Sequence, residues 1–275
     1  MSRVYVIIFI MLAFCGDLFA QYSEDDYSNK GFLNQYWNDI KSISTNSLSP
    51  QHYPDWKLLT YAGLTSIFIL SHDMEFHEEY GLEKQYGRFS LPKSLAEIGN
   101  FYDKPGTLYF TAGLAGAMYG SGKLFNDQKL VQTTHLMVKS LIITGIFTTG
   151  LKVLIGRARP YTADNPHKFK PFNFKFNTDY MSMPSGHTSS IFAMMTVIAK
   201  QYDSWYVKLP AYTFAVSVAF QRMNSRKHWG SDLIIGGTLG YLIGSAIVNK
   251  YGKNSYGYRL QPAVSSNGVG FTLNF

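Results

Sequence analysis

The stretch that decides the fold is Pro184–Lys200, PSGHTSSIFAMMTVIAK, in which a short polar motif opens an apolar run. Ser185 is typical of a helix N-cap, because its side-chain oxygen can accept a hydrogen bond from the first turn. The exposed amides of that turn form an anion site. Gly186 lets the backbone approach an oxyanion closely, and His187 would stand beside it. We predict a helix over 187–202 with an anion site at its start; an ordinary capped helix with an incidental histidine is the alternative.

Five further apolar segments have helical periodicity. They lie near 57–71, 106–121, 134–155, 208–222 and 232–249. The chain shows no internal repeat and no low-complexity linker. We therefore predict one all-α domain, a helical bundle with a six-helix core.

The predicted organisation has four parts. A signal peptide at 1–20 precedes a polar segment with an amphipathic helix at 21–56, the helical core at 57–250 and a C-terminal tail at 251–275. The first part has the basic start, apolar run and small-residue end of an export signal, although an uncleaved anchor is the alternative. The amphipathic helix, over 32–43, is expected to pack on the core rather than on a membrane surface. The tail alternates loosely and predicts a short strand pair.

The amino-acid composition narrows the classes of partner that the chain could bind. Hydrophobic residues make up 46% of the chain and charged residues 16%, with a formal net charge of +7. A basic balance favours phosphates, anionic lipids or nucleic acid. The basic residues are scattered among apolar helices without a basic stripe, which disfavours nucleic acid. The single cysteine, Cys15, lies inside the predicted signal peptide, so the exported chain would have no cysteine nucleophile or cysteine metal site.

Two more clusters of residues could bind an anion, as the Pro184-Ser185-Gly186-His187 motif could. Lys152 lies seven residues before Arg159, and Pro160 then ends any helix. Lys is a compact charge for phosphate and Arg can hold two oxygens; helix-terminal cations that meet a dipole or lipid headgroups are the alternative. In the third cluster, Arg222 is followed by His228 and Asp232.

The third cluster predicts an activated histidine. A carboxylate one helical turn beyond a histidine can accept its ring N–H, which fixes the tautomer and raises the basicity of the other nitrogen. His228 and Asp232 have this spacing. In the alternative reading, Asp232 is only a helix N-cap and the histidine lies at the surface. All three clusters fall at one end of the predicted bundle, where they could hold a phosphate and attack it without a metal.

The combined pattern resembles the type-2 phosphatidic acid phosphatase superfamily, which includes bacterial class A acid phosphatases and vanadate-dependent haloperoxidases. The family pattern is a Lys followed after six residues by Arg-Pro, then Pro-Ser-Gly-His, then Ser-Arg with a His and an Asp downstream. Gln221 replaces the usual Ser, which puts a minor supporting contact in doubt, and Gly156-Arg157 also fits the family. The matching residues are Lys152, Arg159-Pro160, Pro184-Ser185-Gly186-His187, Arg222, His228 and Asp232.

The resemblance implies a role for each of these residues. His228 would attack phosphorus and form a phosphohistidine, Asp232 would orient it, and His187 would protonate the leaving oxygen. No metal or cofactor is implied. The residues implied to bind the phosphate are Lys152, Arg159, Ser185, Gly186 and Arg222.

We therefore predict a metal-independent hydrolase of phosphomonoesters, most of all of a lipid phosphate such as phosphatidate, an isoprenoid pyrophosphate or lipid A. A small soluble phosphomonoester is a further substrate class. The alternatives are a vanadate-dependent haloperoxidase built on the same pocket and a non-catalytic lipid-binding envelope protein. The segment 161–183 interleaves Phe with Lys and is either a lid facing the substrate or a solvated excursion.

The sequence gives conflicting signals on whether the predicted helices span a membrane. A spanning helix needs about 20 largely apolar residues, and most of the predicted helices are shorter. Lys139 interrupts one of them, and the mean hydropathy of −0.08 is low for a polytopic membrane protein. If residue 21 is outside and six helices span, the clusters would face the cytoplasm, so either the bundle does not fully span or one segment is misread. We predict an exported, membrane-associated protein of a bacterial-type envelope, facing the periplasm, with full integration left open.

Overall fold

A computed structural model describes residues 37–38, 40–41, 56–80, 91–252, 259–265 and 268–274. The predicted signal peptide lies outside the described residues. So does most of the amphipathic segment 32–43, of which residues 37, 38, 40 and 41 are helical. The fold over the rest of the chain can be compared element by element with the prediction.

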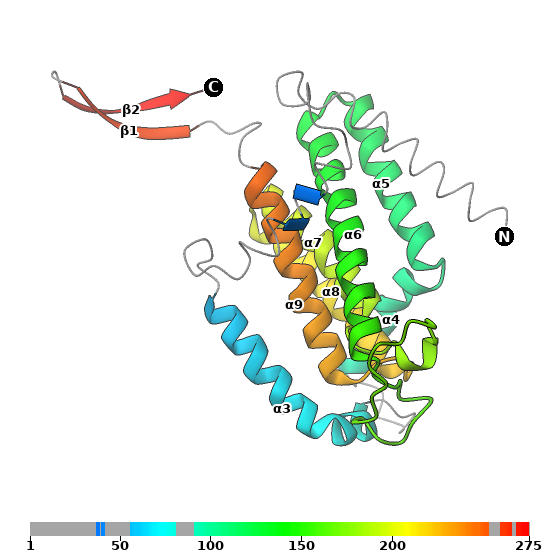
Figure 1. The fold of residues 1–275 in the computed structure, drawn as a ribbon. Helices are drawn as coiled ribbons and strands as arrows, with labels where there is room; N and C mark the ends of the chain where they lie inside the picture. Colours follow the sequence, from blue (N-terminus) through cyan, green and yellow to red (C-terminus); the bar gives the residue numbers. More distant parts are fainter. Residues whose placement is uncertain are drawn as a thin grey trace.

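The described core is helical, as predicted (Figure 1). Its helices are α3 (Trp56–Tyr80), α4 (Leu91–Asp103), α5 (Thr107–Leu124), α6 (Gln128–Ile155), α7 (Gly186–Tyr202), α8 (Trp205–Asn224) and α9 (Gly230–Ile247). Six of them correspond to the six predicted segments, and the all-α fold class is confirmed. The seventh, α4, was not predicted. A 3₁₀ turn, η1 (Thr178–Tyr180), and a π-helical turn, η2 (Val248–Gly252), complete the helical elements.

Local sequence explains where several helices start and stop. Asp127 caps α6, because its Oδ1 accepts a hydrogen bond from the Leu130 backbone N–H at 2.9 Å. Gly156 ends α6 in the left-handed conformation, with φ 59°. Ser185 caps α7 as the sequence predicted, accepting from the Thr188 N–H.

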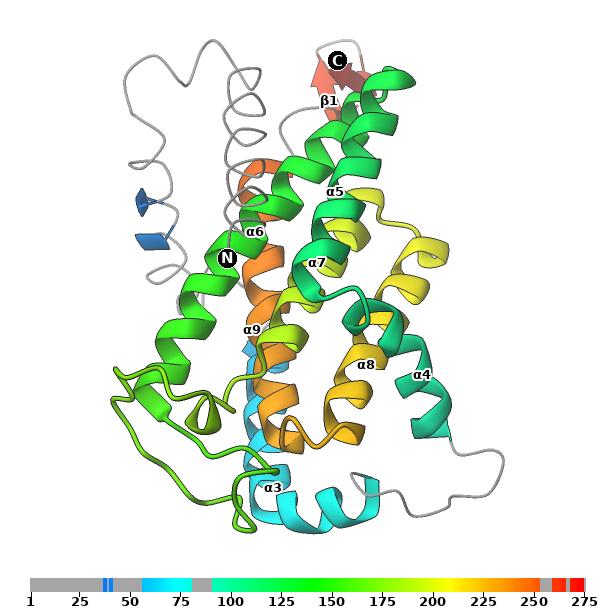
Figure 2. The ribbon, with the colours of Figure 1, turned by 90° about the vertical axis from the view of Figure 1, so that its right-hand side faces the viewer.

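Helix α7 packs closely against α9 at the centre of the bundle, which Figure 2 shows from the side. A Cβ added at Gly240 would lie 2.1 Å from the Ser189 carbonyl oxygen, and one at Gly236 would lie 2.8 Å from the Ser185 carbonyl oxygen. Glycine at these positions lets the two backbones approach. The start of α7 is thereby fixed beside the start of α9. The buried apolar core around this contact includes Ile191, Met194, Val197, Val218 and Ile243.

The described part of the C-terminal tail contains two strands. Strands β1 (Arg259–Ser265) and β2 (Gly268–Asn274) pair antiparallel, which confirms the predicted strand pair in the tail.

By length and composition alone, two helical runs in the described part of the chain are apolar enough to cross a membrane: α6, and residues 230–251 at and after α9.

Candidate active site

Four helix ends meet at one end of the bundle. Helices α6 and α8 end there, and α7 and α9 begin there (Figure 2). The Ser185 backbone N–H donates to the Asp232 carbonyl at 3.0 Å and so joins the starts of α7 and α9. The segment between α6 and α7 folds over the same end, where the Lys170 N–H donates to the Gly156 carbonyl. The structure therefore brings the three sequence clusters into one region.

His228 is buried, with 2% of its surface exposed, and Asp232 is fully buried. Their facing atoms, His228 Nδ1 and Asp232 Oδ2, lie 3.7 Å apart. Ser182 stands beside them: its Oγ lies 3.5 Å from His228 Nδ1 and donates to Asp232 Oδ2. Asp232 Oδ2 also accepts the Trp229 backbone N–H at 3.0 Å. The carboxylate thus both caps α9 and faces the histidine, and the histidine is not at the surface.

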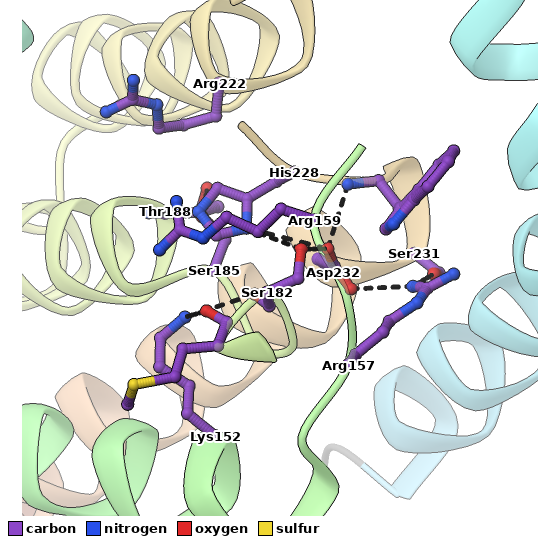
Figure 3. A network of polar contacts seen from close by, with 12 residues as sticks. Lys152, Arg157, Arg159, Ser182, Ser185, Thr188, Arg222, His228, Ser231 and Asp232 are labelled. Carbon is purple, nitrogen blue, oxygen red and sulfur yellow. Dashed lines mark hydrogen bonds and ion pairs between the residues drawn. The ribbon is translucent and has the colours of Figure 1, made fainter. Parts of the chain in front are cut away.

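The guanidinium of Arg157 holds the other carboxylate oxygen of Asp232 (Figure 3). Arg157 Nη1 lies 2.7 Å from Asp232 Oδ1, and Arg157 Nη2 lies 2.7 Å from Asp73 Oδ2. All three side chains are fully buried. Asp73, from α3, also accepts the Ser231 backbone N–H at 2.9 Å. Sequence reasoning gave Arg157 no role and did not single out Asp73; a carboxylate just beyond the predicted apolar segment 57–71 was the available signal.

Two of the predicted phosphate-binding cations hold backbone carbonyl groups. Lys152 Nζ donates to the carbonyls of Met181, at 2.5 Å, and Ser182, at 3.2 Å. Arg159 Nε donates to the Thr178 carbonyl at 3.0 Å. Both cations lie close to the Ser182–Asp232–His228 group in Figure 3. Exchange of these carbonyls for phosphate oxygens would bring positive charge to a bound anion.

Arg222 and His187 share a different partner. Arg222 Nη1 lies 2.6 Å from Asp103 Oδ1, and His187 Nε2 lies 3.3 Å from the same oxygen. No dashed line joins Arg222 to the other residues drawn in Figure 3. Asp103 closes α4, the helix that was not predicted, although Leu91, Leu95, Ile98 and Tyr102 have helical spacing.

The environment changes the pKa of both histidines. Burial lowers the pKa of His228 from 6.5 to about 3, although the nearby Asp232 carboxylate acts in the opposite direction. Burial, together with the nearby Arg222 guanidinium, lowers the pKa of His187 to about 4, and Asp103 opposes this shift. Both rings are therefore neutral at neutral pH in the unliganded site. That state suits His228 as a nucleophile.

The aromatic segment 161–183 is largely exposed. It is fixed to the end of α6 by backbone hydrogen bonds, such as those from the Ala158 N–H to the Lys168 carbonyl and from the Asn173 N–H to the Val153 carbonyl. Its large exposed side chains are Tyr161, Phe169, Phe172, Phe174 and Phe176. Its action as a lid stays a prediction.

In the described part of the chain, no three side chains of the His, Cys, Asp and Glu types gather as a metal site would require.

Comparison with known proteins supports the family suggested by the motifs. A family model of the PAP2 superfamily matches residues 134–256, which include all the predicted site residues. Helices α3, α4 and α5, and with them Asp73 and Asp103, lie outside the matched PAP2 segment.

The individual proteins that resemble this chain either match it over a short length or have low sequence identity. A lipid A 1-phosphatase of Porphyromonas gingivalis is 38% identical over 66 residues, 23% of this chain and 15% of that protein's length. A transmembrane PAP2 type phosphatidylglycerolphosphate phosphatase from Bacillus subtilis is similar in structure, with a TM-score of 0.49 and 17% identity over 71% of this chain and 96% of that one. Aquifex aeolicus LpxE gives a TM-score of 0.37 and 20% identity over 59% of this chain and 97% of that one.

Proposed function

We propose that the protein is a metal-independent lipid phosphatase that works through a phosphohistidine on His228. The observation that carries the proposal is the buried His228–Asp232 pair beside the capped start of α7. Pure anion binding would not require a carboxylate behind a histidine. The match of residues 134–256 to the PAP2 superfamily model supports the same chemistry.

In the first step, His228 attacks phosphorus. Its Nδ1 faces Asp232, which leaves Nε2 for the new N–P bond. The P–O bond to the leaving group breaks, and His187, protonated once the anionic phosphate is bound, gives that oxygen a proton. In the second step a water oxygen attacks phosphorus, the N–P bond breaks, and His187 takes the water proton. Phosphate is released and both histidines return to their starting states.

The charge that develops on the phosphoryl oxygens needs fixed donors. Lys152 and Arg159 stand beside the histidine, and the N-terminal amides of α7, starting at Gly186, add backbone donors. Ser185 keeps these amides oriented because it caps the helix. Arg222 would join them from α8, sharing its donors between the phosphate and its present partner, Asp103.

A lipid substrate is favoured over a soluble one by the apolar surface. Large exposed apolar side chains gather on several helices; they include Tyr61, Leu64, Ile67 and Phe68 on α3, Ile98 and Phe101 on α4, and Trp205, Tyr206 and Leu209 on α8. Exposed apolar area of this extent is typical of a lipid or protein contact. An almost wholly apolar pocket of about 560 Å³ is lined by residues of α3, α7, α8 and α9, including Met223 and Gly230 close in sequence to Arg222 and His228. Such a pocket suits an acyl chain.

The same surface supports membrane association in a bacterial-type envelope. Among the described residues, two helical runs have the length and composition to cross a membrane. The export signal on which a periplasmic location depends lies outside the described residues. We propose that the site works on phosphorylated lipids at a membrane surface.

His228→Ala tests the mechanism. We expect it to abolish phosphate release from dioleoyl phosphatidate in detergent micelles and from p-nitrophenyl phosphate, because it removes the nitrogen proposed to form the N–P bond. A colorimetric phosphate assay of the purified full chain, with and without EDTA, measures this. EDTA should change neither the wild-type rate nor its substrate preference, and phosphatidate should be the better substrate.

The control is His167→Ala, which replaces an exposed histidine of the 161–183 segment and should leave the rate near wild type. Full activity of His228→Ala would overturn the mechanism. Halide oxidation with peroxide and vanadate would favour the haloperoxidase alternative, and no phosphate release from any lipid phosphate would favour a non-catalytic protein.

A further inference from the structure

Asp103 places one carboxylate between two proposed site residues from different helices. Its Oδ1 lies 2.6 Å from Arg222 Nη1 and 3.3 Å from His187 Nε2. Its Oδ2 accepts from Gln221 Nε2 at 3.2 Å and lies 3.4 Å from Arg222 Nη2. Gln221 is the position where the chain departs from the family's usual Ser, and here its amide holds Asp103. One carboxylate therefore joins a phosphate-binding cation to the group proposed as the general acid.

We propose that Asp103 is a positioning residue of the phosphatase site, which aims Arg222 and gives His187 the negative partner that it needs to carry a proton. The inference rests on the proposed function, because it assigns Asp103 a role in the same reaction. It extends the site beyond the segment matched by the family, onto α4.

The place of Asp103 is fixed by close packing of α4 on α8. A Cβ added at Gly99 would lie 2.3 Å from the Ser217 carbonyl oxygen and 2.8 Å from Gln221 Cβ, so glycine is needed for the backbones to approach. Asp103 lies one helical turn beyond Gly99, as Gln221 lies one turn beyond Ser217. Tyr102, fully buried beside Asp103, anchors the end of α4. The carboxylate is therefore set by two packed helices and not by a free loop.

His187 needs a negative partner because cations face it from several elements. Arg222 approaches from α8, Lys152 from α6 and Arg159 from the segment after α6, and the Tyr102 ring meets its edge from α4. Burial and these cations disfavour the imidazolium form, and Asp103 is the carboxylate that favours it. Without Asp103, the ring in the unliganded site would have to take its proton beside these cations with no facing carboxylate.

Asp103→Asn tests the inference, since it keeps the shape and removes the charge. We expect kcat at pH 7 to fall by roughly ten- to a hundredfold, at or below the lower end of the 10²–10⁴ contribution typical of a positioned acid or base, because the acid itself stays in place. The alkaline limb of the plot of kcat against pH should move toward lower pH, because the imidazolium is less favoured. KM should change much less than kcat. Asp103→Glu, which restores the charge, should move the limb back toward its wild-type position.

The matched control is Asp203→Asn, the same change at an exposed carboxylate paired with Lys208 far from these residues in the fold. It should leave both rate and pH profile unchanged. An unshifted alkaline limb in Asp103→Asn would overturn the inference. So would a lower KM at unchanged kcat, since that would make Asp103 a competitor of the phosphate.

A second readout separates this inference from the proposed function. The imidazole pKa of His187 can be followed by NMR in the unliganded protein, without turnover, and Asp103→Asn should lower it. Absence of phosphate release from the wild type would refute the proposed function alone. An unchanged His187 titration in Asp103→Asn would refute the inference alone.

Discussion

Two carboxylate–guanidinium pairs flank the site, and they differ in their contact with water. The Asp73–Arg157 pair, behind Asp232, is wholly buried. The Asp103–Arg222 pair, beside His187, has a carboxylate that is 32% exposed. Charges in a low-dielectric interior cost much to leave unpaired, whereas exposed pairs contribute little to stability.

The difference suggests a division of labour between the two sides. The buried pair is a fixed part of the fold: it ties α3 to the start of α9 and holds the carboxylate that faces His228. The open pair is adjustable, because the five donors of the Arg222 guanidinium can hold Asp103 and a phosphate oxygen together. This arrangement fixes the nucleophile and leaves a substrate-binding cation able to accept an anionic ligand.

Arg157→Gln should have the largest effect of the changes that test this division. It leaves Asp73 and Asp232 buried without a cation, and breaking a buried pair typically costs about 3–5 kcal/mol of unfolding free energy. Phosphate release should be lost as well, since Asp232 would no longer be held. Denaturant unfolding of the purified protein in detergent, followed by circular dichroism, measures the stability.

Arg222→Gln is the matched change on the open side. The Asp103 carboxylate that is left behind is 32% exposed and can be hydrated, so the stability loss should be clearly smaller than for Arg157→Gln while phosphate release still falls steeply. Equal losses of stability in the two variants would break the comparison.

The pH dependence of wild-type activity gives a smaller effect that sharpens the comparison of the two pairs. Attack requires neutral His228, whose pKa is lowered to about 3 by burial, and protonated His187, whose pKa is lowered to about 4. Activity is lost as pH falls through the first value and as it rises through the second, so kcat/KM should peak below the ordinary histidine pKa of 6.5. In kcat the peak should lie at higher pH, because bound phosphate favours the imidazolium. Stopped assays across buffers check both, and a rate that climbs steadily into the alkaline range would contradict the roles.

Much of this arrangement follows from local sequence. Apolar residues at helical spacing marked six helices, and Ser185 marked the start of α7, because both signals act within a few residues. The spacing of His228 and Asp232 placed the carboxylate beside the ring for the same reason.

The parts that sequence reasoning missed depend on contacts between distant segments. Asp73 meets Ser231, and Asp103 meets Arg222, across more than a hundred residues. Neither carboxylate has a local motif; each acquires its role only when α3 packs on α9 or α4 packs on α8. The short helix α4 was overlooked, and with it the partner of His187.

The most direct test of the mechanism is to trap the covalent intermediate. The full-length protein is mixed with ³²P-labelled phosphatidate, quenched in alkali at early times, digested and mapped by mass spectrometry. We predict label on the peptide that contains His228, stable to alkali and released by acid, and none in His228→Ala. Turnover of the labelled lipid without label on His228, or label retained in His228→Ala, would contradict a phosphohistidine at this residue.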